Sequence, residues 1–484
     1  MAADERLVSD LAAVLGPGLL ISPDACVAFE CDALTAHRHP PDLVALPTSV
    51  EQVRETLRLC RQHRVPVVAR GAGTGLSGGA LPVPGGLLLV LSRLDRILEV
   101  DPVRALARVE PGVTNLAVSE AAAPYGLYYA PDPSSQVACT VGGNVAENSG
   151  GVHCLKYGLT VHNVVELQLV TLGGELLTVG ADAGDAPGLN LLSLVIGSEG
   201  MLGVVVEVTV RLLPLPRRVE LLLAAFDDVG RCADAVGTLI AAGIVPAGLE
   251  MMDAPALRAA EAFAGCGYPL HAQALLLCEI DGLAADVEQD LARTRRLLEQ
   301  AGATGLQVAR DADERRRLWS GRKSAFPAVG RLAPDYYCMD GTIPRRHLAA
   351  VLARIDELSR EHGLAVANVF HAGDGNLHPL ILFDAGKADE LQRAERFGAE
   401  ILEACVAAGG TVTGEHGVGV EKLGPMCSQF DTGELEAFHA LKRAFDPDGL
   451  LNPGKAVPTL HRCAEYGAMR VHAGRLPFPH LPRF

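Results

Sequence analysis

Arg70-Gly-Ala-Gly-Thr-Gly-Leu-Ser-Gly-Gly79 is the stretch of sequence that decides the fold. It follows a short apolar run at residues 65–69, which we predict to be a β-strand. The second, third and fourth glycines match G-x-G-x-x-G, the fingerprint of a Rossmann loop that opens a helix. Here, however, Pro82 and Pro84 fall where that helix would continue, and the next apolar run, at residues 86–91, begins too soon for a helical crossover. We therefore predict a loop without a helix, whose backbone amides can cradle a diphosphate; a glycine-rich turn without a ligand is the alternative.

Small polar residues continue this pattern further along the chain. Residues 129–136 and 140–151 are rich in glycine, serine and side-chain amides and carry almost no charge. Backbone with so few bulky side chains can lie close against a flat, polar, extended ligand. After Arg217 the pattern changes to strands that alternate with longer helices, which is typical of an antiparallel sheet covered by helices. We therefore predict an α+β protein with two unlike parts.

The composition restricts the possible partners. The chain has 484 residues and a formal net charge of −16, which argues against binding to nucleic acid or to an anionic membrane surface. No apolar run reaches the ~18 residues of a membrane-spanning helix, and the N-terminus lacks the pattern of a secretory signal, so we expect a cytoplasmic protein. The twelve cysteines include no C-x-x-C pair, so neither a zinc knuckle nor an iron–sulfur cluster is expected.

A second motif, Phe370-His-Ala-Gly-Asp-Gly-Asn-Leu-His-Pro379, predicts a β-hairpin. Asp374-Gly375 is a preferred dipeptide of the two-residue hairpin turn. With that turn, His371 would lie directly opposite His378, with the Cβ atoms about 5 Å apart. Two imidazoles at that separation are well placed to chelate a metal ion; two exposed or stacked histidines beside a tight turn are the alternative.

The motifs together resemble those of a known family. Four segments are similar to motifs of the FAD-linked oxidases of the vanillyl-alcohol oxidase type: residues 70–79, residues 140–151, Gly197-Ser-Glu-Gly200 and Asn452-Pro-Gly-Lys455. The histidine hairpin and Gly414-Glu-His-Gly-Val-Gly419 resemble the D-2-hydroxyacid dehydrogenase branch of that family. Within the branch, three further segments are similar to the FAD-binding D subunits of bacterial glycolate oxidases: residues 319–326, 334–343 and 460–469.

The resemblance implies a fold and a division of the chain. The fold is an FAD-binding domain in two parts, with an inserted substrate or cap domain made of an antiparallel sheet and helices. We accordingly expect four segments: an N-terminal helical segment (1–38), the FAD-binding domain (39–217), the cap domain with a metal site (218–430), and a C-terminal helix and tail that return to the FAD-binding domain (431–484).

The resemblance also implies roles for individual residues. The diphosphate of FAD would be wrapped by Arg70, Gly71, Gly73, Thr74, Gly75, Leu76 and Ser77. The adenosine and flavin would be lined by Pro131, Asp132, Ser135, Thr140, Gly142, Gly143, Asn144, Ser149 and Gly150, and the site would be completed by Glu199 and Asn452. A divalent metal, zinc or manganese, would be bound by His371, His378 and Glu415. His416 would be the catalytic base, and Arg322 would bind the substrate carboxylate bidentately.

Departures from the family pattern limit the size and charge of the substrate that we expect. Relatives that oxidise 2-hydroxyglutarate carry a lysine shortly before the segment that here begins at Asp340, and a threonine four residues after the arginine. This chain has Tyr336-Tyr-Cys-Met339 and Phe326 instead. The contacts for a second carboxylate are therefore missing, and we expect a small substrate, glycolate, with D-lactate as its nearest rival. Because the loop at residues 70–79 contains no histidine, we expect FAD to be bound non-covalently.

The expected reaction converts the hydroxyacid to the 2-oxoacid, with the hydride passing to the flavin. Because this chain has no cluster motif, the electrons must leave through partners. The resemblance implies a second flavin-type subunit and an iron–sulfur subunit, which feed the respiratory chain and would bring this chain to the inner membrane without direct insertion. The residues leave two other classes open: a metal-dependent hydrolase built on His371, His378 and Glu415, and a non-catalytic assembly subunit.

Overall fold

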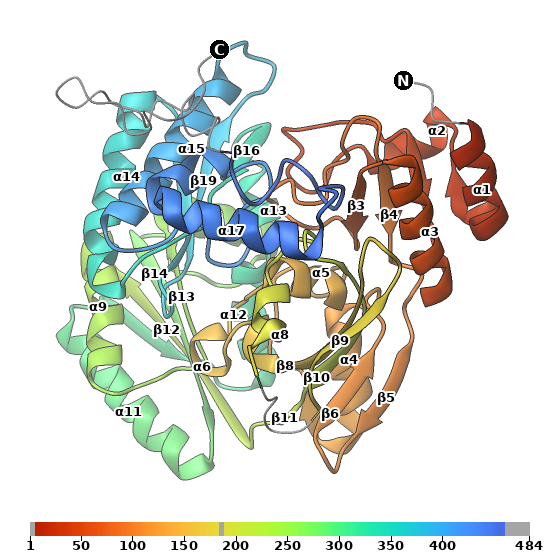
Figure 1. Cartoon of the computed structure of the whole chain (residues 1–484). Coiled ribbons are helices and arrows are strands. Elements are labelled where there is room, and N and C mark those ends of the chain that lie inside the picture. The colour runs from red at the N-terminus through yellow and green to blue at the C-terminus, as the bar shows by residue number, and fades with distance from the viewer. Residues whose placement is uncertain (1–4, 183–187, 460–484) are drawn as a thin grey trace.

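The computed structural model describes residues 5–182 and 188–459, and its first half begins with a four-stranded sheet (Figure 1). The strand order is β1-β2-β4-β3, with bounds β1 (Leu19–Leu20), β2 (Leu43–Ala45), β3 (Val67–Arg70) and β4 (Leu87–Val90). Leu87 and Leu89 face a core with helices α1 (Glu5–Leu15) and α3 (Val50–His63), whereas Leu88 and Val90 face a smaller core that includes Cys26 of α2 (Pro23–Cys26). This alternation follows from the two-residue period of a strand.

The glycine-rich loop joins β3 to β4 and contains no helix. The predicted absence of a Rossmann helix is therefore confirmed. The two strands are nevertheless parallel, with Val67 beside Leu87 and Arg70 beside Val90. A crossover between parallel neighbours is thus made here by irregular backbone, which leaves the amides of the loop free of helical hydrogen bonds.

A five-stranded antiparallel sheet completes the first half, in the order β5-β6-β10-β8-β9. Its strands are β5 (Ile97–Asp101), β6 (Leu106–Val109), β8 (Val164–Val170), β9 (Leu176–Gly180) and β10 (Val204–Arg211). The associated short elements are α4 (Asn115–Ala122), β7 (Leu127–Tyr128), α5 (Val141–Glu147), α6 (Cys154–Tyr157), α7 (Thr160–Asn163), α8 (Leu191–Val195) and β11 (Leu213–Pro214). Val141 and Val145 of α5 pack into the core of this sheet, which fixes that helix beside the glycine-rich loop.

The second half is built on an eight-stranded sheet, with β17 paired at one end to β19. Its strands are β12 (Arg218–Phe226), β13 (Gly248–Asp253), β14 (Ala274–Gly282), β15 (Gly305–Val308), β16 (Asp335–Cys338), β17 (Gly341–Thr342), β18 (Val366–His371) and β19 (Asn376–Phe383). All pairings are antiparallel. The predicted α+β class is therefore confirmed.

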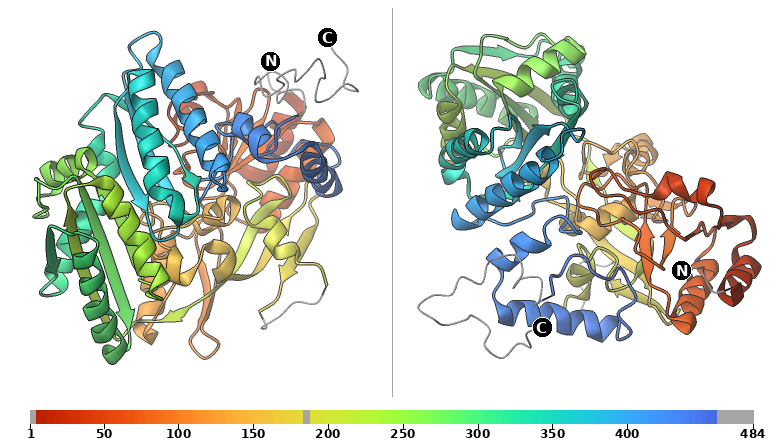
Figure 2. Two further views of the ribbon diagram at one scale, coloured as in Figure 1. Left: turned by 90° about the vertical axis from the view of Figure 1, so that its left-hand side faces the viewer. Right: turned by 90° about the horizontal axis from the view of Figure 1, so that it is seen from above.

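Helices cover both faces of this sheet (Figure 2). Leu222, Ala224 and Phe226 of β12 face the helices α9 (Val229–Ala241), α11 (Ala284–Gln300), α14 (Leu348–His362) and α15 (Glu390–Ala407). Leu221, Leu223 and Ala225 face the opposite way, toward α10 (Ala254–Ala264), α12 (Ala312–Lys323) and α13 (Ala325–Val329). A strand buried on both faces reads as a continuous apolar run, as β12 does.

The end of the described chain returns to the first half. After α16 (Leu423–Gln429), helix α17 (Thr432–Phe445) crosses between the halves (Figure 1). The Val67 N–H donates to the Leu450 carbonyl, and the Asn452 N–H donates to the Val67 carbonyl, both at 2.8 Å. The chain thus adds residues 450–452 to the edge of β3. The motif expected at residues 460–469 lies outside the described residues.

The histidine hairpin differs in register from the prediction. β18 ends at His371 and β19 begins at Asn376, which pairs with His371, while His378 pairs with Val369. The prediction of a two-residue turn and of directly opposed histidines was therefore wrong. Because Val369 and His371 are two residues apart on one strand, the two histidines still lie on the same face, diagonally across the ladder.

Contacts outside the hairpin explain its longer loop. The Gly373 N–H donates to the Leu249 carbonyl, and the Ile343 N–H donates to the Gly375 carbonyl, both at 3.0 Å. The Gly373 carbonyl accepts a hydrogen bond from Arg345 at 2.7 Å. The loop backbone is thus used for packing against neighbouring strands, and a tight turn would leave those groups unpaired.

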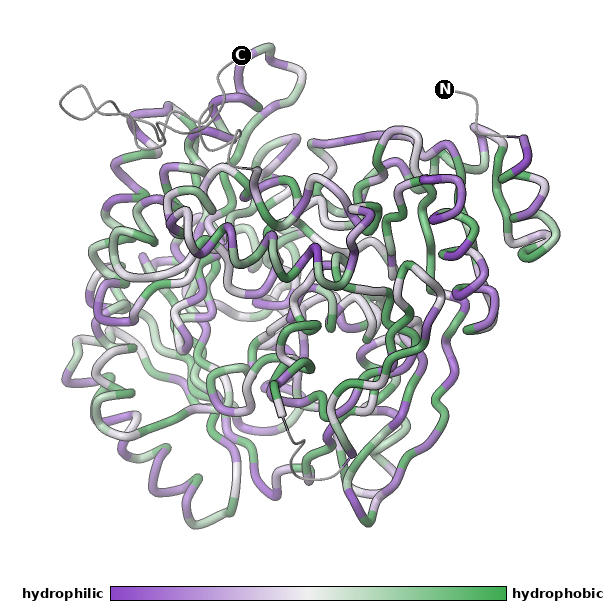
Figure 3. The backbone as a smooth tube through the Cα atoms, in the orientation of Figure 1, coloured by the Kyte–Doolittle hydropathy of each residue, from purple (hydrophilic) through white to green (hydrophobic). Residues whose placement is uncertain are grey.

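Hydropathy along the backbone agrees with this layering (Figure 3). Strands β3 and β4 are mainly hydrophobic, and α1 alternates between hydrophilic and hydrophobic residues, as an amphipathic helix does. Within residues 5–182 and 188–459, no helix is both long and apolar enough to cross a membrane.

Candidate active site

One cavity of about 440 Å³ collects residues of both halves. From the first half come the loop after β3, the N-terminal part of α5 and the turn around Glu199. From the second half come Lys323, Phe326, Pro327, His371, His378, Glu415 and His416. Most of the predicted cofactor residues therefore share one space with the predicted metal ligands, although at least 172 residues separate these two sets in the sequence.

Most of the predicted cofactor residues line this cavity. They are Arg70, Gly71, Gly73, Thr74, Gly75, Leu76, Ser135, Thr140, Gly142, Gly143, Asn144, Ser149 and Glu199. Five others are not part of the lining: Ser77, Pro131, Asp132, Gly150 and Asn452. The lining is dominated by glycine, small side chains and backbone, which leaves amide groups open toward a bound oxygen-rich ligand.

Two glycines of the loop are required by close contacts. Gly73 has φ +72°, and a Cβ atom there would clash with the Arg70 guanidinium, which folds back beneath the loop. A Cβ atom on Gly71 would clash with Thr140 Oγ1. Thr140 in turn caps α5 by accepting from the Gly143 N–H at 3.2 Å. The backbone of the loop at Gly71 therefore lies directly against Thr140, at the start of α5.

The predicted residues behind the lining hold its parts together. Asn452 Nδ2 donates to the carbonyls of Gly79 and Glu199, at 3.2 and 2.6 Å. The Ser77 carbonyl accepts from the Val420 N–H at 3.0 Å. The two oxygens of Glu199 accept from the N–H groups of Val418 and Gly419, at 2.7 and 2.8 Å. These bonds join the cofactor loop to the segment that carries Glu415 and His416.

The remaining three predicted residues also lie behind the cavity wall. The Pro131 carbonyl accepts from Asn115 Nδ2 at 3.0 Å. Asp132 Oδ2 lies 2.9 Å from His153 Nδ1. Gly150 lies against the candidate metal ligand, because a Cβ atom there would be 2.7 Å from Glu415 Oε2.

The predicted metal ligands converge on one point. His371 Nε2 and His378 Nε2 lie 3.1 and 2.9 Å from the same oxygen, Glu415 Oε1. The other nitrogen of each ring faces an acceptor, because His371 Nδ1 is 2.8 Å from Glu250 Oε1 and His378 Nδ1 is 3.3 Å from the Met339 carbonyl. Each ring thus donates from Nδ1 to that acceptor. Burial lowers the pKa of His371, but the charges of Glu250 and Glu415 outweigh this and raise it well above its usual range. A divalent cation bound by the two Nε2 atoms and the Glu415 carboxylate would take the place of any proton between them.

His416 lies beside this group on a loop between Gly414 and Gly417. Its ring stacks on His378 with the centroids 4.9 Å apart, and its Nε2 is 3.8 Å from Glu415 Oε1. Burial lowers the pKa of His416 to about 4, in spite of the nearby Asp340 carboxylate. The imidazole is therefore neutral at physiological pH, which is the state that a proton acceptor needs.

A buried carboxylate shapes the loop that carries Glu415 and His416. Asp340 Oδ2 accepts from the N–H groups of Gly414 and His416, at 3.0 and 2.9 Å, and from Lys422 Nζ at 2.9 Å. Asp340 Oδ1 accepts from Asn376 Nδ2, at the start of β19, at 2.8 Å. Asp340 and Lys422 are both fully buried. Asp340, which is paired with Lys422, thus connects the loop to the histidine hairpin through its hydrogen bonds to His416 and Asn376.

Arg322, the predicted substrate contact, is not part of the cavity lining. Its side chain is 1% exposed, and Nη2 lies 2.6 Å from Glu250 Oε2, behind the metal ligand His371. The next residue, Lys323, is exposed and lines the cavity. The helix α12 therefore turns the arginine inward and the lysine toward the cavity.

Sequence reasoning missed several residues of the site. Lys323 follows an arginine that the family pattern singles out, so it attracted no separate interpretation. Glu147, at the end of α5, also lines the cavity; burial, followed by the charges of Glu199 and Asp32, raises its pKa well above the usual range. Glu250 lies in a strand that the apolar pattern did not reveal. Only the three-dimensional neighbours of these residues identify them.

Two families match the chain. The family described as FAD binding domain matches residues 41–180, and the family described as FAD linked oxidases, C-terminal domain, matches residues 215–456. Together these matches include the glycine-rich loop, the histidine hairpin and Glu415 with His416.

Several curated proteins are similar over most of their length. Glycolate oxidase subunit GlcD of Escherichia coli (strain K12) is 61% identical over 470 residues, which are 97% of this chain and 94% of that protein. Its namesake from Bacillus subtilis (strain 168) is 40% identical over 430 residues, or 89% and 92% of the two chains. A probable mitochondrial D-lactate dehydrogenase of Danio rerio is 30% identical over 466 residues, or 94% and 92%.

Solved structures share the fold at low sequence identity. p-Cresol methylhydroxylase with substrate bound superposes with a TM-score of 0.80 at 16% identity, covering 95% of this chain and 98% of that one. The 4-ethylphenol oxidase from Gulosibacter chungangensis gives a TM-score of 0.79 at 17% identity, covering 94% and 97%. The expected two-part architecture of the vanillyl-alcohol oxidase type is therefore confirmed.

Proposed function

The chain belongs to the FAD-linked oxidases, and from this membership we propose that it is an FAD-dependent dehydrogenase that oxidises glycolate, with D-lactate as a second substrate, to the 2-oxoacid. One observation carries the proposal: a neutral histidine and a His-His-Glu group line the same cavity as the glycine-rich loop. The E. coli and B. subtilis relatives are named for glycolate, and the Danio rerio relative is named for D-lactate.

The residues of the cavity suit both groups that this reaction needs. The glycine-lined cradle between the loop and α5 suits an FAD diphosphate and non-covalent binding, and the converging His371, His378 and Glu415 suit zinc or manganese. When bound, FAD supplies a hydride acceptor, and the cation supplies Lewis acidity toward the substrate hydroxyl oxygen.

The chain itself supplies the catalytic base and the side chain that binds the substrate carboxylate. His416 Nε2 takes the hydroxyl proton, because its ring is neutral and adjacent to the candidate metal ligand Glu415. We revise the predicted carboxylate contact: Lys323, which lines the cavity and forms no ion pair within the described part of the chain, binds the substrate carboxylate. Arg322 acts indirectly, through its ion pair with Glu250.

The electrons leave through other chains in this proposal. The relatives named as subunits support a complex of several subunits. We propose that it includes a second flavin-type subunit and an iron–sulfur subunit. The predicted cytoplasmic location, with attachment to the inner membrane only through these partners, is part of the same proposal.

His416→Ala tests the base assignment directly. The FAD-loaded variant should keep its flavin absorbance and its thermal stability, whereas anaerobic reduction of the flavin by glycolate should slow by roughly 10²–10⁴-fold, the usual contribution of a general base. His347→Ala, which alters a half-buried histidine just before α14, is the matched control and should reduce normally. Normal flavin bleaching in His416→Ala would sink the assignment, and no bleaching of the unaltered protein by any small 2-hydroxyacid would sink the proposed function.

A further inference from the structure

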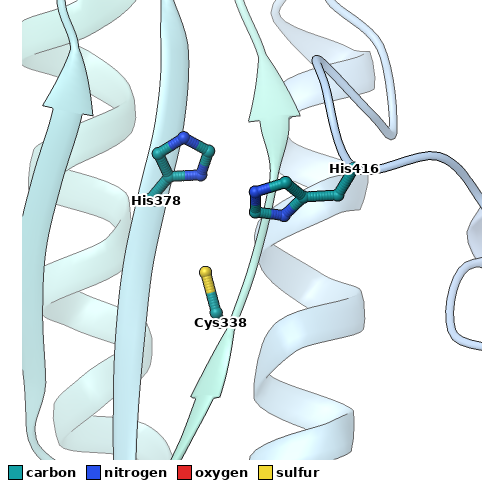
Figure 4. Close-up of side chains that lie close together, drawn as sticks. All are labelled: Cys338, His378 and His416. Carbon is teal, nitrogen blue, oxygen red and sulfur yellow. The ribbon is translucent and has the colours of Figure 1, made fainter. Parts of the chain in front are cut away.

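A second set of donor atoms shares one residue with the proposed metal site. Cys338, His378 and His416 each offer one ligand atom, and these atoms all lie within 4.8 Å of one another. Figure 4 shows the Cys338 thiol pointing toward the gap between the two imidazole rings. The His371, His378 and Glu415 set also includes His378, so the two sets share that single side chain.

The fold brings these three residues together from three separate segments. Cys338 ends β16 and pairs with Leu380 of β19, and His378 lies two residues before Leu380 on the same face of that strand. His416 enters from the loop that Asp340 holds. The juxtaposition therefore follows from strand register and from one buried carboxylate, and not from a flexible surface.

The chemistry of this second set differs from that of the first. Two imidazoles and a carboxylate accept zinc or manganese, whereas a thiol with two imidazoles favours thiophilic ions such as zinc and cadmium over magnesium, calcium or manganese. His416 Nδ1 is buried and has no hydrogen-bond partner among the described residues, so its ring can turn without breaking a bond there.

We propose that Cys338, His378 and His416 form a second, inhibitory site for a thiophilic divalent cation. The ion enters through the cavity, which His378 and His416 line, and reaches Cys338 just behind the wall, where that residue is 4% exposed. On binding, the thiol releases its proton to solvent and its sulfur coordinates the ion. No group is oxidised or reduced.

Closing the site needs only a small movement. Ligand bonds of about 2.0–2.3 Å place tetrahedral donors about 3.5 Å apart, so the widest separation here must shrink by roughly 1 Å. His416 is the residue that can move, because it lies between Gly414 and Gly417, the latter with φ +79°. His378 and Cys338 are fixed in the sheet.

The consequence for activity rests on the proposed function. An ion in the second site withdraws His378 from the first site and His416 from the substrate. It therefore removes a metal ligand and the base together. Zinc would thus support the first site at low concentration and inhibit at higher concentration, whereas manganese would support it without inhibition.

Cadmium titration of the FAD-loaded, manganese-supplied protein tests the site without relying on turnover. Cadmium should produce the ultraviolet thiolate-to-cadmium charge-transfer band with one equivalent per chain. Cys338→Ser should abolish the band, and His416→Ala should weaken cadmium binding at least ten-fold. Cys154→Ser is the control, because its sulfur lies near Glu415 but outside the second set. The concentration of zinc needed for half inhibition should rise at least ten-fold in Cys338→Ser alone.

Two results would overturn the proposal. One is a band that survives in Cys338→Ser or disappears in Cys154→Ser. The other is equal zinc inhibition of the unaltered protein and Cys338→Ser. If Cys338→Ser fails to fold, Cys338→Ala serves for both measurements. Because the band is read in the absence of substrate, a protein that fails to oxidise glycolate would leave this test intact.

Discussion

Glu250 shows how one buried carboxylate can orient two neighbours. Its Oε1 is 2.8 Å from His371 Nδ1, and its Oε2 is 2.6 Å from Arg322 Nη2. Both Glu250 and Arg322 are 1% exposed. A carboxylate on the far nitrogen of a metal-binding histidine fixes the tautomer and makes the other nitrogen a better ligand. Arg322 supplies the counter-charge to this buried carboxylate.

Glu250→Gln should weaken metal binding by roughly 10–100-fold, the usual effect of losing such a partner. It should also destabilise the fold by about 3–5 kcal/mol, because Arg322 is left buried without a counter-charge. Metal affinity, measured by competition with a chelator on the FAD-loaded protein, separates the two effects in the double variant Glu250→Gln with Arg322→Gln. There the stability should recover while metal affinity stays low.

A matched variant checks that the effect is local. Glu279→Gln alters a buried carboxylate on the adjacent strand β14, where it contacts His153 and Trp319. Metal affinity should be unchanged in it. Unchanged metal affinity in Glu250→Gln itself would contradict the positioning role.

Lys323→Ala should raise the KM for glycolate by at least ten-fold, because a charge-assisted contact to a carboxylate contributes about 1.5–3 kcal/mol. Flavin absorbance and metal affinity should remain normal, since Lys323 contacts neither Glu250 nor the metal ligands in the structure. Arg322→Ala should instead lower metal affinity and stability. Steady-state kinetics with a parallel metal titration distinguish the two; a large KM effect in Arg322→Ala at saturating metal, with none in Lys323→Ala, would restore the original prediction.

Among the secondary-structure elements, hydrophobic periodicity predicted the presence of the helices better than it predicted how the strands of the hairpin pair. The longer helices predicted after Arg217 are present, α9, α11 and α15 among them, because each buries one apolar stripe. β13 was not predicted, since Glu250 and Asp253 interrupt its apolar run. Both carboxylates are buried and contact partners more than a hundred residues away in the sequence: Glu250 contacts His371, and Asp253 accepts from the Asn368 N–H. The prediction of the hairpin turn was wrong for a similar reason, because the backbone of the loop forms hydrogen bonds with Leu249 and Ile343.

Asp253 makes the stability of this region depend on pH. It caps α10 by accepting from the Ala256 N–H, and its other oxygen accepts from the Asn368 N–H at 2.9 Å. Burial raises the pKa of Asp253 from 3.8 to about 6. A raised carboxyl pKa in the folded state favours folding below pH 3.8, and this contribution is lost as the pH rises through about 6.

Asp253→Asn should therefore gain stability relative to the unaltered protein as the pH rises from about 4 to 7, by on the order of 2–3 kcal/mol. The asparagine keeps the acceptor for the helix cap and carries no charge to bury. Denaturant unfolding of both proteins at several pH values gives the difference. A stability difference that does not change with pH would show that Asp253 is not the titrating group.

At the scale of the whole molecule, the loop of residues 413–419 is held from both halves. Asp340 binds its amides from the second half, and Glu199 binds the amides of Val418 and Gly419 from the first. Glu199 was predicted as a cofactor residue from its motif. It does line the cavity, but its hydrogen bonds to this loop could not be read from the sequence, because the partners are more than two hundred residues away.

Glu199→Gln should loosen this loop without unfolding either half. The amide side chain replaces one acceptor with a donor, so one buried N–H is left unpaired at a cost of about 1–3 kcal/mol. Amide hydrogen exchange of residues 413–419 should accelerate about ten-fold or more, and glycolate-dependent flavin reduction should slow. Glu207→Gln, on β10 and paired with Arg108, is the control. Unchanged exchange in the loop would contradict its attachment to Glu199.

The pairing of residues 450–452 with β3 has a consequence for biosynthesis. β3 and the glycine-rich loop leave the ribosome well before Asn452, which closes the backbone of that loop by binding Gly79, 373 residues earlier, and Glu199. The cofactor cradle is thus closed only after residue 452 has been synthesised. FAD is therefore expected to bind only to a chain that includes residue 452, so a product stalled or clipped before that residue would accumulate as a colourless apoprotein.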